Sequence, residues 1–358
     1  MLAYIIKKIT YGILVLWGVL TLVFFLFNVL PGDPARMMLD KREDANQLAV
    51  IKQKYAFDRS VGEQYALYLN DVLPLSIHYN STTAFTSLMS GKYQYSKLFL
   101  IADYTLVFKT PYLRESFVRK GTLVTSILSN TFKNTFVLAL SSISIALFLG
   151  LILGVFSALY KDTLIDKFIL FVSVLGMSLP SFFASIIIAW LFGFVLHNYT
   201  SLNMTGSLFE VDDYGRGSFL QIKNLILPAI TLGIRPLSVI IQLCRNSLLE
   251  VLSMDYVRTA TAKGLSKFTV IFKHALHNAL NPVVTAVSGW FASLLAGAVF
   301  VEYIFAWNGI GKEIVDALNK MDLPVVMGAV LFIASIFVII NIIVDLIYGW
   351  LDPRIRIS

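Results

Sequence analysis

The sequence is poor in charged residues, and this shortage limits the class of protein that it can encode. Only 14% of the 358 residues are Asp, Glu, Lys or Arg, whereas soluble domains hold about 25%. Five long stretches contain no charged residue at all: residues 9–30, 134–160, 168–209, 275–301 and 323–344. A sixth, residues 224–244, is interrupted only by Arg235. Because a helix needs about 20 consecutive apolar residues to cross a bilayer, we predict an all-α polytopic membrane protein with about six transmembrane helices.

Groups that carry covalent chemistry are also scarce. Cys244 is the single cysteine, which excludes a framework of internal disulfides. The phosphate-binding loop Gly-x-x-x-x-Gly-Lys-Ser/Thr is missing, as are the hydrolase patterns Gly-x-Ser-x-Gly and His-Glu-x-x-His. His274 and His277 have a spacing that metal ligands use, but no Cys, Asp or Glu ligand lies nearby. We therefore expect a chain that is not an enzyme and that has no metal site and no cofactor of its own.

The net charge of +7 suggests basic loops beside anionic lipid and a partner protein, and we expect no nucleic acid. Short cytoplasmic loops of membrane proteins carry an excess of Lys and Arg. The basic positions that we expect on the cytoplasmic side are Lys7, Lys8, Lys161, Lys167, residues 245–273, Arg354 and Arg356. With six crossings, both termini lie on that side.

The charge-free stretches divide the chain into three parts. Residues 1–30 form an N-terminal tail and the first transmembrane helix, which is too long for a cleaved signal peptide and ends at a Pro-Gly-Asp-Pro turn, residues 31–34. Residues 31–132 form an external loop region, read as a small external layer or as a disordered linker. Residues 133–358 form a five-helix core with a cytoplasmic loop at 250–281.

The cytoplasmic segment 245–284 has the pattern of a helix, a stop and a second helix. Ser253 or Asp255 can cap a short helix, and residues 256–263 contain no Gly or Pro that would break it. Gly264 supplies a left-handed stop, and Leu265 follows where an apolar side chain folds back onto the last turn. The pattern predicts a rigid knob between two membrane spans.

One face of this knob is small and weakly apolar. Val257, Ala260 and Thr261 share a face at spacings of three and four, and Arg258 and Lys263 flank it. Two interpretations are open: a helix that lies on lipid headgroups, or a knob that enters a groove of a protein partner. Interfacial helices bring Trp, Phe or Leu to the lipid, so the small residues favour a protein partner.

Two strings of residues in this segment resemble a known family. Residues 255–265 read Asp-Tyr-Val-Arg-Thr-Ala-Thr-Ala-Lys-Gly-Leu, and residues 274–284 read His-Ala-Leu-His-Asn-Ala-Leu-Asn-Pro-Val-Val. They resemble the coupling loop of binding-protein-dependent ABC import permeases, most closely the dipeptide, oligopeptide and nickel branch, in the manner of oligopeptide permease B. The positions that match the general signature are Ala260, Gly264 and Leu276. The positions that depart from it and match the peptide branch are Arg258, Thr259, His274 and His277. The turn at 31–34 and the strings at 227–229 and 351–354 are also similar, whereas residues 79–112 have no counterpart, so we interpret them as an enlargement of the first external loop without an assigned role.

The resemblance implies a type I ABC importer permease fold in the bacterial plasma (inner) membrane. It also implies an importer of di- or oligopeptides whose partners are a second permease subunit, two cytoplasmic ATPase subunits and an extracytoplasmic substrate-binding protein, with ATP bound by the ATPase subunits. An alternative is the same architecture importing nickel or metal chelates, and an alternative of another class is an ion-coupled secondary transporter. The residues that the resemblance places in the ATPase-coupling loop are Asp255, Tyr256, Arg258, Thr259, Ala260, Lys263, Gly264 and Leu265.

Arg235 lies near the middle of its span, where an arginine is costly unless it faces protein or water. We consider it a pathway residue that attracts substrate, or a structural contact between helices beside Pro228 and Pro236. Asn341 and Asp345 lie one turn apart near the inner end of the last span. They could bind a cation, but we favour the interpretation that they are hydrogen-bonding groups of a helix end.

Overall fold

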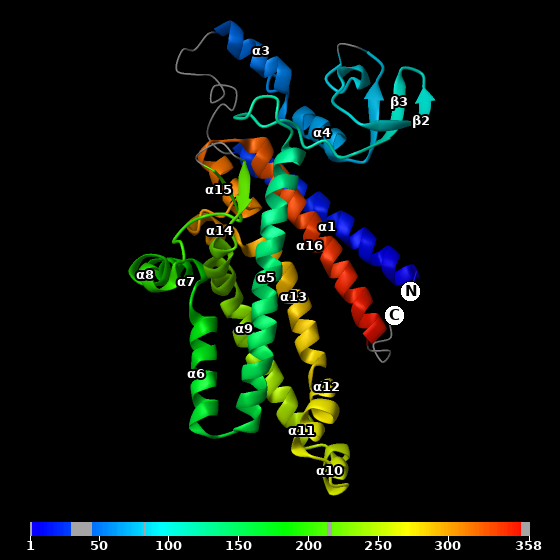
Figure 1. Ribbon diagram of the computed structural model, residues 1–358. Coiled ribbons are helices and arrows are strands. Elements are labelled where there is room, and N and C mark those ends of the chain that lie inside the picture. The colour runs from blue at the N-terminus through cyan, green and yellow to red at the C-terminus, as the bar shows by residue number, and fades with distance from the viewer. Residues whose placement is uncertain (1, 30–44, 82–83, 213–216, 352–358) are drawn as a thin grey trace. The chain divides into compact units, whose positions relative to one another are not determined.

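The computed structural model of the protein describes residues 2–29, 45–81, 84–212 and 217–351, and most of these residues are helical (Figure 1). Four continuous segments are long and apolar enough to cross a membrane: Ile6–Asn28, Val124–Leu159, Lys223–Leu252 and Leu323–Leu346. They lie in helices α1 (Leu2–Val29), α5 (Val124–Leu159), α9 (Lys223–Leu252) and α16 (Leu323–Leu351). Two bent helix pairs raise the number of candidate spans among the described residues to as many as six, where each pair counts as one span. The predicted helical membrane protein with about six spans is confirmed.

The two bent spans differ from the straight helices that the charge-free stretches suggested. The first joins α6 (Leu164–Ser178) to α7 (Ser181–Ile188) and the π-helix η2 (Ala189–Val195), with a bend of 109° where Pro180 interrupts the helix. The second bends by 50° between residues 267–279 and 281–296. Its parts are α11 (Lys267–Thr269), the π-helix η3 (Val270–Ala275), α12 (Leu276–Ala279) and α13 (Asn281–Gly297).

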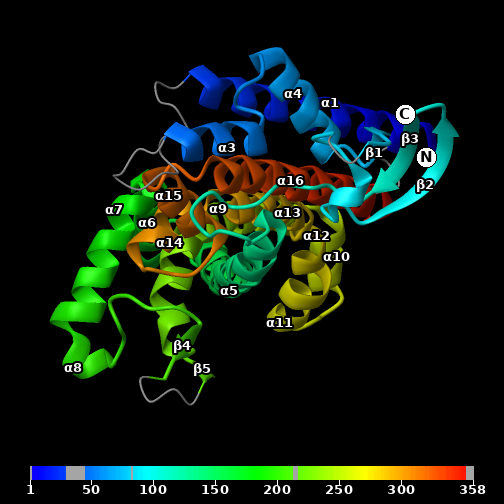
Figure 2. The same cartoon turned by 90° about the horizontal axis from the view of Figure 1, so that it is seen from above.

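The chain forms two compact units, and each is described by itself. The first comprises residues 1–10, 131–313 and 335–358. Here α9 contacts α6 and α13, and the short helix α10 (Asp255–Ala262) lies beside α11 and α12 in both views (Figures 1 and 2). The remaining elements that begin in this unit are α8 (His197–Thr200), β4 (Phe209–Val211), β5 (Ser218–Leu220), α14 (Val299–Ile304) and α15 (Ile310–Asn319).

A buried carboxylate joins α5, α14 and α15 within the first unit. Glu302 is fully buried and accepts hydrogen bonds from Thr135 Oγ1 at 2.7 Å and from the Gly311 N–H at 2.7 Å. Gly309 leaves room for it, because a Cβ at that position would lie 2.3 Å from the carboxyl carbon. Burial raises the pKa of Glu302, which lies outside the candidate spans, to about 7.

The second unit comprises residues 11–130 and 314–334, and it contains the folded outer segment. Helices α3 (Ala45–Tyr55) and α4 (Val61–Val72) precede a three-stranded antiparallel sheet of order β1-β3-β2, formed by Leu75–Tyr79, Tyr104–Lys109 and Tyr95–Ile101. A short 3₁₀ turn, η1 (Leu88–Ser90), lies between β1 and β2. We did not predict this sheet from the sequence. Its strands β2 and β3 lie within the segment 79–112, so this enlargement contains folded structure.

A buried aspartate organises the outer segment. Asp71 is buried in the last turn of α4, where its carboxylate accepts from Tyr93 Oη at 2.7 Å and from Arg114 Nε at 2.9 Å. The Lys109 ammonium donates to the Asp71 carbonyl oxygen, and burial lowers the pKa of Lys109 to about 8. These bonds connect the end of α4, the loop before β2 and the segment after β3. The predicted turn at 31–34 and the similarity at 352–354 lie outside the described residues.

Candidate functional site

The knob predicted between two spans is present as the short helix α10, which spans Asp255–Ala262. Its N-cap residue is Met254, in the extended conformation, and no side chain caps the helix. The expected cap from Ser253 or Asp255 is therefore wrong, because Ser253 Oγ donates instead to the Glu250 carbonyl oxygen at 2.7 Å. The turn from α9 into α10 is made by backbone bonds, with the Met254 N–H donating to the Val251 carbonyl oxygen at 3.1 Å.

The helix stops where the sequence predicts. Gly264 has a φ of +80°, in the left-handed region that L-residues with a side chain disfavour. Its N–H donates to the Thr261 carbonyl oxygen at 3.0 Å, which is the inner bond of a Schellman cap. Leu265 remains 40% exposed. The left-handed stop at Gly264 is thus formed, and the next apolar side chain stays available at the surface.

Two of the three residues on the small face of α10, Val257 and Ala260, pack against the chain itself, whereas Thr261 is exposed. Val257 and Ala260 are 4% and 7% exposed and belong to a core cluster with Val251, Val270 and Ala275. They are therefore not available to enter the groove of a partner, contrary to our expectation from the sequence. The same spacing of three suits self-packing and docking equally, so the sequence pattern could not separate them.

The exposed surface of the knob is made by other side chains. Of the predicted coupling residues, those that are exposed are Asp255, Tyr256, Arg258, Thr259, Lys263, Gly264 and Leu265. Arg258 lies 3.7 Å from Asp255 in an exposed ion pair. Phe268 and Phe272, which the sequence did not lead us to single out, have tilted rings with centroids 4.5 Å apart and are 69% and 47% exposed. Two aromatic residues four positions apart just beyond the glycine stop are the signal that identifies this apolar patch.

Tyr256 fixes the knob to the following helices. Its hydroxyl donates to the His274 carbonyl oxygen at 3.3 Å and accepts from Asn278 Nδ2 at 2.8 Å. Ser266 caps α11 by accepting from the Thr269 N–H at 3.2 Å. Because α10 is packed on one face and bonded to η3 and α12 through Tyr256, it cannot rotate without moving the second bent span.

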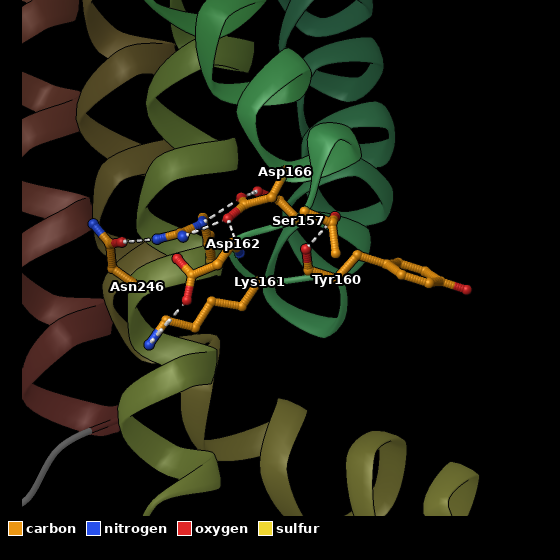
Figure 3. Close-up of polar contacts among 8 residues, drawn as sticks. Ser157, Tyr160, Lys161, Asp162, Asp166 and Asn246 are labelled. Carbon is orange, nitrogen blue, oxygen red and sulfur yellow. Dashed lines mark hydrogen bonds and ion pairs between the residues drawn. The ribbon is translucent and has the colours of Figure 1, made fainter.

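A buried ion pair anchors the end of α9 that leads into the knob (Figure 3). Asp166, on α6, is 2% exposed and accepts from Arg245 Nε at 2.8 Å and Nη2 at 2.7 Å. The Asp162 N–H, at 2.9 Å, and Ser157 Oγ complete four donors to this carboxylate. Bidentate pairing fixes orientation as well as distance. The pair thereby connects the turn between α5 and α6 to α9, about two turns before α9 ends.

Arg235 does not join this network. It is exposed on α9, about 18 Å along the helix from Lys223 at 1.5 Å per residue. Among the residues that the structure describes, no hydrogen bond or ion pair reaches it. The sequence also pointed to Asn341 and Asp345 in the last span. Asn341 Nδ2 donates to the Phe337 carbonyl oxygen at 2.8 Å, and the Asp345 carboxylate forms an ion pair with the Lys8 ammonium at 2.6 Å.

Comparisons with known proteins show the family to which the chain belongs. Residues 150–357 match the family described as binding-protein-dependent transport system inner membrane component, and residues 1–86 match the N-terminal region of such membrane components. The di/tripeptide transport system permease protein of Pseudomonas aeruginosa (strain UCBPP-PA14) is 34% identical over 99% of each chain. The dipeptide transport system permease proteins of Alkalihalophilus pseudofirmus and Escherichia coli (strain K12) are each 32% identical over 99% of this chain and cover 100% and 99% of their own length. The inward-facing MetNI methionine ABC transporter covers 62% of this chain and 95% of its own, with 18% identity and a TM-score of 0.49.

Proposed function

Because the chain belongs to the family of binding-protein-dependent transport system inner membrane components, we propose that it is a permease subunit of an ATP-driven importer of di- or oligopeptides. The similarity to dipeptide and di/tripeptide permeases over nearly the whole chain supports peptides over nickel or metal chelates as the substrate. In this proposal, the protein lies in the bacterial plasma membrane with both termini in the cytoplasm, and it provides half of the pathway.

The other half of the pathway and the energy come from partner chains. A second homologous permease subunit completes the pathway, and an extracytoplasmic binding protein delivers the peptide. Two cytoplasmic ATPase subunits bind and hydrolyse ATP, since the sequence has no phosphate-binding loop of its own. The chain itself needs no cofactor.

The observation that supports this proposal most strongly is the construction of the knob. A segment that transmits displacement must be short and stiff, and α10 is packed on one face, braced by Tyr256 and stopped by Gly264. The apolar side chains that remain exposed beside the stop are Leu265, Phe268 and Phe272. In our proposal these side chains enter a groove of the ATPase subunit, while Arg258 and Lys263 contact its rim.

Transport by the purified complex in proteoliposomes tests the proposed function. We expect peptide uptake that requires ATP and the binding protein and that vanadate stops. Uptake driven by a proton gradient through this chain alone would establish the secondary transporter instead. Uptake of nickel chelates but of no peptide would refute the peptide substrate.

The proposed docking surface has its own test, with a matched control. Phe268→Ser removes an aromatic ring that is 69% exposed on α11, just after the knob, and Phe99→Ser removes one that is 68% exposed on β2 of the outer segment. We expect the first variant to lose roughly tenfold or more in affinity for the ATPase subunits, as for an aromatic anchor in a binding pocket. The second variant should bind the ATPase subunits as tightly as the wild type does. Equal copurification of the ATPase subunits with both variants would show that Phe268 does not dock.

A further inference from the structure

Helix α9 is covered on two of its sides by close helix contacts. A Cβ at Gly154 of α5 would lie 2.7 Å from the Cβ of Cys244, and a Cβ at Gly176 of α6 would lie 2.5 Å from Ser238 Oγ. Small residues allow helix backbones to approach this closely in membranes. The faces of α9 that bear Cys244 and Ser238 are therefore closed by the chain itself.

The uncovered face of α9 is polar. It follows the spacing four, three, four and four, which keeps side chains on one side of a helix, through Arg235, Val239, Gln242, Asn246 and Glu250. Arg235, Asn246 and Glu250 are exposed, and Val239 and Gln242 are half-buried. We call these five residues the polar stripe. It covers about 22 Å of helix at 1.5 Å per residue, from the middle of the span to the end that leads into α10.

Contact with lipid is energetically unfavourable for this face. Arginine and side-chain amides inside a bilayer face the bundle interior or a water-filled cavity. By contrast, the side chains that α6 exposes include large apolar ones, which suit lipid: Leu164, Phe168 and Phe171 are 82%, 67% and 60% exposed. The polar stripe consists of four polar residues and one valine, so contact with lipid does not explain why it is exposed.

The neighbouring side chains hold the stripe in place without neutralising its charge. Asn246 Oδ1 accepts from Arg245 Nη1 at 3.3 Å, and Arg245 is itself fixed by Asp166. Gln242 Nε2 lies 3.3 Å from Met177 Sδ, which is a weak acceptor. The side-chain amides of Gln242 and Asn246 thus keep hydrogen-bonding capacity for a group outside this chain.

We infer that the polar stripe lines the inner half of the transport pathway and that the Arg235 guanidinium binds the terminal carboxylate of the passing peptide. Arginine pairs with a carboxylate through two parallel hydrogen bonds. The amides of Gln242 and Asn246 can donate to and accept from a peptide backbone whatever its side chains are. Glu250, at the far end of the stripe, repels a carboxylate, so the peptide is bound less tightly toward the exit. This inference rests on the proposed function and adds the residues that contact substrate.

Cysteine accessibility distinguishes the pathway from the other possible neighbours of this face. Val239→Cys lies in the stripe, whereas Leu237→Cys, at the same depth, packs against the buried core cluster. The native Cys244 is fully buried and can remain as an internal control. In the assembled complex, we expect a water-soluble thiol reagent to modify Val239→Cys but not Leu237→Cys, and peptide to slow the modification. If both cysteines are protected from every reagent, the second permease covers the stripe. If only lipid-soluble reagents modify Val239→Cys, lipid covers it. Either result overturns the inference.

The role of Arg235 needs a second measurement. For this, we use one peptide with a free carboxylate and its amidated form, in a pair that the binding protein binds equally well. Arg235→Gln should lower uptake of the free peptide roughly 10- to 100-fold, the effect of one charge-assisted hydrogen-bonded pair, and should change uptake of the amidated peptide much less. Arg235→Lys should restore part of the difference. If the wild-type complex transports peptides and Arg235→Gln changes both uptakes equally, the carboxylate contact is refuted while the proposed function stands; if the wild type transports no peptide, the proposed function itself fails.

Discussion

Replacing Arg245 by Met should destabilise the protein strongly, because it leaves Asp166 buried without its partner. Arg245 supplies two of the four hydrogen bonds to a carboxylate that is 2% exposed. Removing one member of a buried ion pair costs about 3–5 kcal/mol. With an unfolding entropy of about 2.1 cal/mol/K per residue, this loss corresponds to a fall of roughly 4–7 °C in the thermal midpoint of a chain of 358 residues.

The assay is thermal unfolding of the purified complex in nanodiscs, with a second variant that relieves the buried charge. Asp166→Asn combined with Arg245→Met should recover most of the loss, because an asparagine can still accept from the Asp162 N–H and donate to Ser157. We expect a coupling of about 2–3 kcal/mol between the two substitutions.

Lys161→Met provides the control. Lys161 lies 4.0 Å from Asp162 with both side chains more than half exposed, and such pairs contribute about 0–1 kcal/mol. An Arg245→Met protein that unfolds within about 1 °C of wild type would refute the anchoring role, given the entropy used above. The same conclusion would follow if the double variant lost the sum of the two single losses.

Two further predictions concern the knob and the buried glutamate. Gly264→Val forces a β-branched residue to a φ of +80°, which costs about 1–2 kcal/mol, and we expect this variant to hydrolyse ATP without peptide uptake. Ala262→Val, on the same knob at a helical position, is the control and should keep uptake coupled to hydrolysis. A Gly264→Val complex that transports like wild type contradicts our account of the stop. Burial raises the pKa of Glu302 from 4.5 to about 7, so its contribution to stability is greatest below pH 4.5 and is lost as the pH rises to 7. Glu302→Gln should therefore gain up to about 3 kcal/mol relative to wild type between pH 4.5 and 7.5, measured as the difference between the two thermal midpoints, and a difference that does not change with pH would show that Glu302 titrates normally.

The spans and the stop of the knob could be predicted because each depends on local chemistry. A charge-free stretch of about 20 residues has few fates other than a membrane crossing, and a glycine after eight helix-compatible residues is a strong signal for a left-handed stop. The bend at Pro180 is different. A proline in an apolar stretch can kink a helix slightly or break it, so the proline alone does not predict a turn of 109°.

Other features needed information that a single sequence holds weakly or not at all. Residues 75–79 alternate apolar and polar side chains, Leu-Ser-Ile-His-Tyr, and this period of two was a usable signal for β1. The burial of Val257 and Ala260 could not be predicted, since a small apolar face fits the chain itself as well as a partner. The Asp166–Arg245 pair joins residues 79 positions apart, and only the fold brings them together.

The break after α6 also affects the lipid around this protein. Its 15 residues extend only about 22 Å, whereas the hydrocarbon core of a bilayer is about 30 Å thick. The chain then turns by 109° and runs across its former direction, so α7 and η2 add little height. Such a mismatch is relieved by local thinning of the bilayer or by tilt. Headgroups beside α6 should therefore be drawn inward, and the protein should be sensitive to the acyl-chain length of the membrane that surrounds it.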